Sequence, residues 1–489
     1  MSKSISRRRF LTVAGSSAVG LAGLAACGSS ATGHAIGPGS PQVKAVEAAR
    51  RRSGNIYAVN LVAQPAVVDL AGQAAHTWAY SSALADPELR MRPGDTLEAT
   101  VVNQVPEPTT VHWHGLAIDN AMDGVPDLTQ KAIAPGASFT YRFVVPDAGT
   151  YWYHSHQGLQ LDRGLYGPLV VEDPTEPGVD VDQVLVLDDW LDGIAGTPDQ
   201  ALASTRGGMG SMGGGMGSMK RMTSSLLGGD AGDITYPMHL INGRPPADRT
   251  KVTAPPRGKV RLRLINAGSD TAYRFAVGGH PLTVTAADGR PVQPVVVDTV
   301  LIGMGERYDV ELTADSGVWP IVASAEGKGG GGAAMLRTTD ATAETAPPMS
   351  ARPAELDGHV LSYTDLRPVA GTALAPHTPD RSYTVDLVGN MDRYQWGLAG
   401  DAQHLNVRSG ERVRITMRNT TTMYHPMHLH GHTFAVATAN GVRKDTINVL
   451  PGRTQVIDFD ADNPGQWMYH CHNTYHQVKG MTTTVSYRT

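Results

Sequence analysis

Hydrophobic and polar residues alternate in three well-separated segments of the chain. The segments read LRMRPGDTLEATVVN, PRGKVRLRLIN and LNVRSGERVRITMRN, at residues 89–103, 256–266 and 405–419. Each segment passes from a glycine turn through the alternating residues to an asparagine, and a period of two residues is typical of a β-strand with one buried face. The chain therefore repeats one β module three times.

A second pair of segments repeats only in the first and third modules. RFVVPDAGTYWYHSH (142–156) matches DFDADNPGQWMYHCH (458–472), since both pass through an Asp and Gly turn into aromatic residues and a His-x-His. The middle module reads LINAGSDTAYRFAVGGH, without the histidines of VVNQVPEPTTVHWHG and MRNTTTMYHPMHLHGH. We expect the first and third modules to carry ligands and the middle module to act as a spacer.

Length and composition agree with this organisation. A chain of 489 residues suggests about three domains, and its 55 Gly and 32 Pro indicate short strands joined by turns. The predicted class is all-β, with three Greek-key β-sandwiches at 45–175, 176–352 and 353–489, separated by proline-rich seams at 174–177 and 347–353. The net charge of −5 without a basic block argues against a nucleic-acid partner.

Residues 1–27 have the basic, then apolar, then small-residue pattern of an export signal. SRRRFL (6–11) resembles a twin-arginine signal, and LAAC resembles a bacterial lipobox, which implies cleavage before Cys27 and lipidation of its thiol. The alternative is an ordinary secretory signal. We predict a flexible tether at 28–44, with the protein held by its lipid alone at the outer face of the bacterial cytoplasmic membrane, in the periplasm.

Eleven of the 18 histidines fall in four short motifs: HWHG, HSH, HPMHLHGH and HCHNTYH. Residues i and i+2 of a strand point to the same face and residue i+1 to the other. Each His-x-His therefore aims two imidazoles at one place, and Cys471 points away from the two histidines beside it. A disulfide to Cys27 is the alternative for this thiol, but Cys27 belongs to the signal.

Two metal sites follow from this geometry. On the Cys471 side, a thiolate, the imidazoles of His425 and His476 and the thioether of Met481 form the donor set of a blue copper site. Zinc is a weaker candidate, because structural zinc prefers Cys-rich sets and catalytic zinc needs only three protein ligands. On the other side remain eight imidazoles, enough for three metal ions: His112, His114, His154, His156, His428, His430, His470 and His472.

The four motifs, in this order and spacing, resemble those of the multicopper oxidases, the family of laccases and bacterial cuprous oxidases. The resemblance covers essentially the whole mature chain and implies cupredoxin-like domains and four copper ions. It implies that His425, Cys471, His476 and Met481 bind the type 1 copper and that His112 and His428 bind the type 2 copper. The implied ligands of the type 3 pair are His114, His154, His156, His430, His470 and His472. The implied reaction passes electrons through Cys471 and its peptide bonds to His470 and His472, and reduces O2 to water.

The resemblance also suggests roles for other residues. Asp123 in DNAMDGVPD stands where the family has an acidic residue near the type 2 copper, so we predict a proton donor; the alternative is a turn aspartate before Gly124. Gln477 occupies the place of a glutamate that relays protons in better-known cuprous oxidases, and Gln cannot ionise. We expect Asp445 and His432 to be structural.

The substrate stays open between Cu(I) and phenols. RGGMGSMGGGMGSMKRM (206–222) places Met209, Met212, Met216, Met219 and Met222 in a Gly/Ser background. Thioethers select Cu(I), which favours copper capture and copper detoxification over a flexible linker or packed core. The alternatives are a generalist laccase and, in another class, an envelope copper-binding or electron-transfer protein. A monomer is expected.

Overall fold

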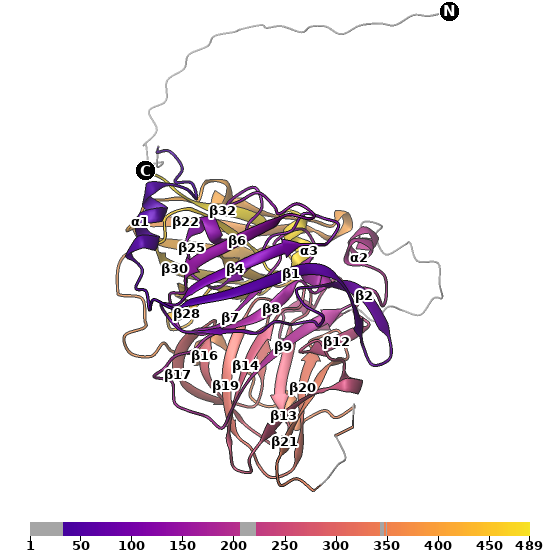
Figure 1. The fold of residues 1–489 in the computed structure, drawn as a ribbon. Coiled ribbons are helices and arrows are strands. Elements are labelled where there is room, and N and C mark those ends of the chain that lie inside the picture. Colours follow the sequence, from indigo (N-terminus) through magenta and orange to yellow (C-terminus); the bar gives the residue numbers. More distant parts are fainter. Residues whose placement is uncertain (1–32, 206–221, 343–346, 349) are drawn as a thin grey trace, which may run out of the picture.

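The computed structural model describes residues 33–205, 222–342, 347–348 and 350–489 (Figure 1). Strands dominate this part of the chain, and its α-helices are short: α1 (Pro41–Ala49), α2 (Pro198–Ser204) and α3 (Thr474–Val478). None of the helices in the described ranges has the length and apolar character needed to span a membrane. The predicted all-β class is confirmed.

The first domain is a pair of four-stranded sheets. One sheet has the order β2 (Ala74–Ala79), β1 (Ile56–Asp69), β4 (Thr96–Asn103) and β6 (Ser138–Val144). The other has the order β3 (Leu89–Met91), β8 (Tyr166–Val171), β7 (Gly149–His154) and β5 (His112–His114). The histidine motifs HWHG and HSH thus begin on the neighbouring strands β5 and β7.

The middle domain is built from sheets of six and five strands. The larger has the order β12 (Met238–Ile241), β9 (Val181–Trp190), β14 (Lys259–Asn266), β19 (Arg307–Thr313), β16 (Leu282–Ala287) and β17 (Arg290–Val297). The smaller has the order β13 (Thr250–Ala254), β21 (Gly331–Thr338), β20 (Val318–Ala325), β15 (Tyr273–Val277) and β18 (Val300–Ile302). A short hairpin of β10 (Thr223–Ser224) and β11 (Gly229–Asp230) lies outside both sheets.

The last domain also pairs a six-stranded with a five-stranded sheet. The first has the order β23 (Gln395–Gly400), β22 (Arg381–Asn390), β25 (Arg412–Asn419), β30 (Thr454–Asp460), β27 (Phe434–Val436) and β28 (Val442–Lys444). The second has the order β24 (Asn406–Val407), β32 (Thr482–Tyr487), β31 (Gln466–Cys471), β26 (His425–Leu429) and β29 (Thr446–Val449). All the main sheets fall inside the expected domain ranges, whose exact boundaries stay a prediction.

The three predicted repeats occupy equivalent places. In each domain an opening strand pairs in parallel with the repeat strand, which pairs antiparallel with a third strand: β1–β4–β6, β9–β14–β19 and β22–β25–β30. The alternation in the sequence thus reflects one topology used three times.

The asparagine that ends each repeat has the same task in all three domains. Asn103, Asn266 and Asn419 are buried, and each side-chain amide donates to two backbone carbonyls while its oxygen accepts from a backbone N–H two residues later. These bonds satisfy buried backbone groups and fix the loop after the strand. In the first and last domains that loop leads directly into the histidine motifs.

The first and last domains lie side by side, and the middle domain packs below both (Figure 1). A continuous cluster of buried apolar residues runs through the middle and last domains, whereas the first domain has a cluster of its own around Trp113. The apolar core of the first domain is thus separate from that of the last domain, and polar side chains can occupy the interface between these two domains.

The expected tether at 28–44 is wrong for residues 33–44, which are ordered against the last domain. Ile36 is buried and donates its backbone N–H to the carbonyl of Tyr487, and α1 begins at Pro41 after the cap Ser40. Val43 of α1 is also buried. The glycines and prolines of this stretch obscured these two apolar residues, and Ile36 contacts residues more than four hundred positions away. The signal 1–27 and Cys27 lie outside the described residues.

Candidate metal centre

The four histidine motifs lie on or directly after the strands β5, β7, β26 and β31. In the first domain, strand pairing sets His112 opposite His154. In the last domain it sets His428 opposite His470. Because alternate residues of a strand share a face, each pairing brings two His-x-His motifs to one side of its sheet.

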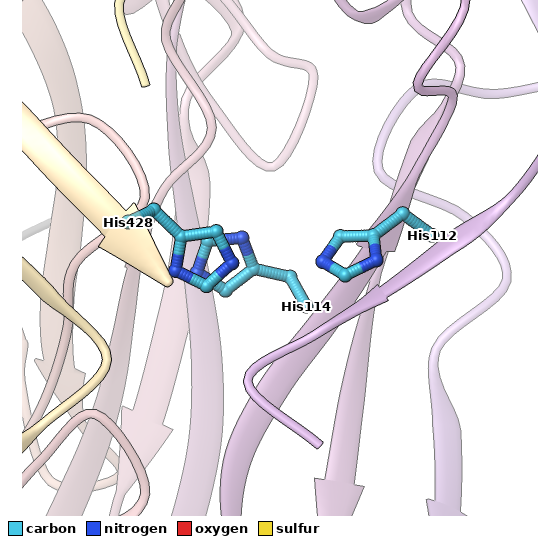
Figure 2. Close-up of side chains that lie close together, drawn as sticks. All are labelled: His112, His114 and His428. Atoms are coloured by element: carbon cyan, nitrogen blue, oxygen red, sulfur yellow. The ribbon is translucent and has the colours of Figure 1, made fainter. Parts of the chain in front are cut away.

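The eight predicted imidazoles come together between the first and last domains. We call these eight histidines the imidazole centre. Figure 2 shows His112 and His114 beside His428, whose ring stacks on that of His114 at 3.8 Å between centroids. Candidate ligand atoms within 4.8 Å of one another form three groups in the centre: His112, His114 and His428; His114, His154 and His472; and His156, His430 and His470.

Hydrogen bonds to the protein orient most of these rings by their Nδ1 atoms. The partners are Asp123 O for His112, Ser155 O for His154, Gln477 for His156, Asp445 O for His428, the Asp123 carboxylate for His430 and Cys471 O for His470. The Nε2 atoms of these rings then face their neighbours. Those of His430 and His470 are 3.1 Å apart, and those of His112, His154, His156 and His428 are buried without a partner.

The donor set of the imidazole centre fits metal ions. Burial lowers the pKa of His114, His154, His156, His428, His430, His470 and His472, so these rings stay neutral with a lone pair available. Buried ring nitrogens without a partner are costly in a folded protein, and a bound metal satisfies them. Imidazole groups of this kind suit copper.

Cys471 lies on the other side of β31, as the alternation predicted. It is a free, buried cysteine, and its Sγ is 3.6 Å from His425 Nδ1 and 3.7 Å from His476 Nδ1. Met481 is fully buried, and its backbone hydrogen-bonds to both Cys471 and His476. We call these four residues the Cys471 pocket. Burial raises the pKa of the Cys471 thiol, so a metal must displace its proton.

The outer nitrogens of the Cys471 pocket are also engaged. His425 Nε2 lies 2.8 Å from Thr421 Oγ1, and His476 Nε2 lies 3.0 Å from the carboxylate of Asp233, which comes from the middle domain. The indole ring of Trp396 covers His476 at 4.1 Å between centroids. Both imidazoles are therefore shielded, and Asp233 brings a carboxylate of the middle domain into contact with the pocket.

The predicted proton donor Asp123 is buried in the imidazole centre. Its carboxylate lies 3.0 Å from His430 Nδ1 and 3.2 Å from His112 Nδ1. Asp123 is also the C-terminal cap of a 3-10 turn, Asn120–Met122, as the alternative interpretation suggested. The turn delivers the carboxylate to histidines of both the first and last domains.

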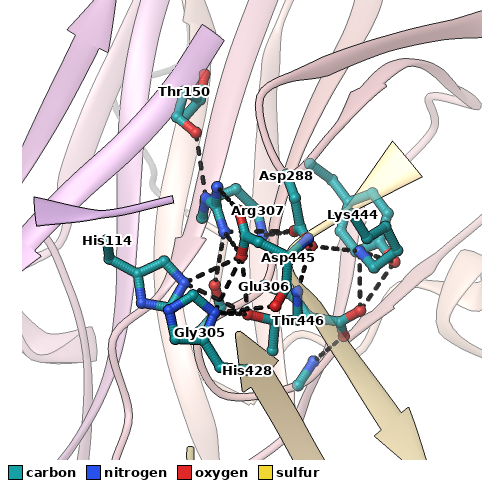
Figure 3. Close-up of polar contacts among 12 residues, drawn as sticks. His114, Thr150, Asp288, Gly305, Glu306, Arg307, His428, Lys444, Asp445 and Thr446 are labelled. Carbon is teal, nitrogen blue, oxygen red and sulfur yellow. Dashed lines mark hydrogen bonds and ion pairs between the residues drawn. The ribbon is translucent and has the colours of Figure 1, made fainter. Parts of the chain in front are cut away.

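Sequence reasoning missed the contact of Asp445 with the imidazole centre. Asp445 Oδ1 lies 3.2 Å from His114 Nε2, and its two oxygens accept from Nη1 and Nη2 of Arg307 at 2.7 and 2.6 Å (Figure 3). Burial opposes its ionisation, but Arg307 holds the pKa of the Asp445 carboxyl well below its usual value. Arg307 comes from the middle domain, about 140 residues away in the chain, and no local signal links the two.

Two other expectations concern residues close to the ligands. His432 is a hydrogen-bonded structural histidine, as expected, because its ring nitrogens contact His430 O and Tyr487 Oη. Gln477 contacts His156 at 3.4 Å and lines a cavity of about 10 Å³ that also touches His472 and Thr474. A cavity of that size holds about one water molecule.

The methionine-rich segment lies almost entirely outside the described residues. Met209, Met212, Met216 and Met219 belong to the stretch 206–221, about which the structure says nothing. Met222 is described, and it packs partly buried against the core of the middle and last domains. Copper capture by this segment stays a prediction.

These observations define a class: a three-domain β-sandwich protein with a Cys–His pocket and a polyhistidine centre joined by one strand. The multicopper oxidase family matches three stretches of the chain, at residues 62–176, 182–344 and 376–489. The chain belongs to the multicopper oxidase family, and its domains are cupredoxin-like.

Named relatives cover nearly the full chain. "Multicopper oxidase MmcO" of Mycobacterium tuberculosis is 44% identical over 95% of this chain and 94% of the relative. A "Copper resistance protein A homolog" of Pseudomonas syringae is 28% identical over 85% and 89%, and "Laccase-2" of Pleurotus ostreatus is 29% identical over 88% and 88%. The crystal structure of a multi-copper oxidase from Pseudomonas thermotolerans is 26% identical, with a TM-score of 0.69 over 89% of this chain and 100% of that one.

Proposed function

We propose that this multicopper oxidase couples the one-electron oxidation of a small reductant to the four-electron reduction of O2 to water. The preferred candidate for the reductant is Cu(I). The observation that carries the proposal is the geometry of β31 and the residue after it. Cys471 faces a pocket with two imidazoles, and its chain neighbours His470 and His472 face the other six imidazoles of the imidazole centre. One short stretch of backbone therefore joins two sites.

The proposed copper sites follow the groups of nitrogens. His425, Cys471, His476 and Met481 hold a type 1 copper, and His112 and His428 hold a type 2 copper. His114, His154 and His472 hold one ion of a type 3 pair, and His156, His430 and His470 hold the other, which supports the assignment by motif. When bound, the four ions supply the single-electron steps that oxidise the reductant and reduce O2.

The protein residues supply the path and the protons. The peptide units on either side of Cys471 are the shortest covalent connection between the two sites. Asp123 donates protons at the imidazole centre, where its carboxylate contacts His430 and His112. Gln477 cannot ionise, but its amide lines the small cavity beside His156 and His472, where a water molecule has room to pass protons.

The surroundings of the Cys471 pocket favour a small cationic reductant over a phenol. Trp396 covers His476, so an aromatic substrate has no exposed imidazole edge to contact. Asp233 hydrogen-bonds to His476 Nε2 and supplies the negative charge that attracts a metal ion. The copper-resistance name of the Pseudomonas syringae relative agrees with this substrate, whereas the laccase name of the Pleurotus ostreatus relative supports phenols as the second candidate.

The same proposal places the protein in the cell envelope, where it serves copper detoxification. A twin-arginine export signal, lipidation at Cys27 and a monomeric chain are parts of this proposal that rest on the sequence alone.

Oxygen uptake tests the choice of substrate. The copper-loaded protein is given Cu(I), or 2,6-dimethoxyphenol, with and without added Cu(II). Much faster turnover with Cu(I), and phenol oxidation that rises only with added copper, is the expected result. Vigorous phenol oxidation without added copper makes the protein a laccase.

A further inference from the structure

We infer that Arg307 of the middle domain is a positioning residue for the imidazole centre: it holds Asp445 so that His114 presents Nδ1, and not Nε2, to the metal. The inference rests on the proposed function, since it concerns the geometry of the proposed copper site. It assigns a task to a domain that carries no histidine of the imidazole centre.

His114 has the opposite orientation to its neighbours in the imidazole centre. Its Nε2 contacts the protein, at 3.2 Å from Asp445 Oδ1 and 3.3 Å from Thr446 Oγ1, and its Nδ1 is buried without a partner. Six of the other rings contact the protein through Nδ1. Because a carboxylate only accepts, Asp445 fixes the proton of His114 on Nε2 and leaves Nδ1 free for a metal.

Arg307 fixes the carboxylate in turn. Its Nη1 and Nη2 donate to the two oxygens of Asp445, so the carboxylate plane cannot rotate away from His114 (Figure 3). A planar guanidinium makes this two-point contact, whereas an ammonium acts as a single point charge.

Arg307 is itself held by all three domains. It is fully buried, its Nε donates to the carbonyl of Thr150 on β7, and its Nη1 donates to Gly305 O in its own turn. Strand β7 carries His154, so the guanidinium links the backbone of the first domain to Asp445 of the last. Arg307 therefore contacts both of the domains that supply the ligands.

The turn before Arg307 also touches the imidazole centre. Gly305 has φ +83°, and a Cβ on it would lie 2.8 Å from His472 Cδ2 and 3.2 Å from His114 Cε1. The middle domain thus packs directly against the rings of His472 and His114. It also contacts Asp445 through Arg307.

Other buried charges surround this pair. Asp288 accepts from the backbone N–H groups of Arg307, Asp445 and Thr446, and Lys444 Nζ lies 3.1 Å from both Asp288 and Glu306. Loss of the Arg307 charge leaves buried carboxylates in excess, which threatens folding. The charge-preserving Arg307→Lys is therefore the safer variant, because it loses the two-point contact and keeps the charge.

Arg263 offers a matched control. It is a buried arginine of the same domain, paired with Asp309 and Asp182, and its Nη1 contacts the Oγ1 atom of the same Thr150 at 3.2 Å. No contact of Arg263 reaches Asp445 or a histidine among its hydrogen bonds and ion pairs in the described chain. Arg263→Lys thus perturbs the same interface without touching His114.

The test compares wild type, Arg307→Lys, Arg307→Gln and Arg263→Lys after copper loading. The readouts are copper per chain, the blue absorption of the Cys471 pocket, the share of copper visible by electron paramagnetic resonance, and the melting temperature without copper. A magnetically coupled copper pair gives no resonance signal. We expect both Arg307 variants to keep the blue absorption but to bind copper at the imidazole centre about 10- to 100-fold more weakly, with a larger visible share. Arg263→Lys should match wild type.

Two outcomes overturn the inference. One is an Arg307→Lys protein whose copper content and resonance spectrum equal those of wild type. The other is an equal loss in Arg307→Lys and Arg263→Lys that follows their melting temperatures, which makes Arg307 a structural residue only. If the wild-type protein showed neither blue absorption nor oxygen uptake, the proposed function itself would be wrong, whatever the variants showed.

Discussion

The Cys471 pocket and the imidazole centre are built in different ways, although they share β31. The pocket's four residues lie within residues 425–481 of the last domain. The imidazole centre takes its histidines from residues 112–156 and 428–472, and it needs Arg307 and Gly305 of the middle domain beside them. The pocket is a product of one folded domain, whereas the centre is a product of domain docking.

This difference predicts unequal sensitivity to change. A substitution within the last domain can remove the pocket and leave the imidazoles in place. A substitution at a domain interface can loosen the imidazole centre while the pocket still forms. The variants that follow are ordered from the largest expected effect to the smallest.

Cys471→Ser should separate the two sites completely. Serine lacks the soft thiolate that a blue copper site requires, so the blue absorption and oxygen uptake with either substrate should fall to background. Copper should still bind at the imidazole centre, as metal analysis can show. Retained oxygen uptake with Cu(I) would mean that electrons enter elsewhere.

Asp123→Asn should affect only the imidazole centre. The variant keeps the shape of the side chain but loses the proton donor, so the steady-state rate should fall about 100-fold and its pH profile should change. The blue absorption should stay at the wild-type level. An unchanged rate and pH dependence would show that Asp123 is only the cap of its turn.

Gly305→Ala should weaken the imidazole centre from the middle domain. The new Cβ meets His472 and His114, so copper affinity there should fall about tenfold, at the low end for groups that orient ligands. Gly441→Ala is the control, because Gly441 has φ +70° and open space around its Cβ position. It should cost only about 1–2 kcal/mol of stability, measured by chemical unfolding. Equal copper loss in both variants would show that the close approach of Gly305 to His472 and His114 has no specific effect on copper binding.

Asp233→Asn should have the smallest effect of these variants, and that effect should be on substrate preference. Loss of one charge beside His476 removes about 1 kcal/mol of attraction for a cation, so kcat/KM for Cu(I) should fall about fivefold while that for 2,6-dimethoxyphenol stays level. Asp248→Asn, at an exposed carboxylate paired with Arg244, is the control. A parallel fall with both substrates would assign Asp233 to the stability of the pocket.

Local patterns predicted the parts of the site that depend on one strand. The opposed faces of His470, Cys471 and His472 follow from strand geometry alone, and the structure places them on two sides as expected. The repeated asparagines and alternating segments likewise predicted the threefold topology.

Contacts between distant segments could not be predicted in this way. The middle domain was expected to be only a spacer, yet Arg307 and Gly305 contact the partners and rings of the imidazole centre. Asp445 was expected to be structural only, and its bond to His114 spans 331 positions. Such pairings depend on how whole domains dock, and no periodicity in one sequence records them.

The most direct test of the central claim, that one strand joins an electron-entry pocket to an oxygen-reducing centre, is a single optical experiment. Cu(I) is added without oxygen to the copper-loaded protein, oxygen is then admitted, and the blue absorption is followed. We predict that the absorption bleaches with Cu(I) and returns with oxygen, without release of hydrogen peroxide. Absorption that bleaches but does not return would contradict an oxidase and indicate an electron carrier.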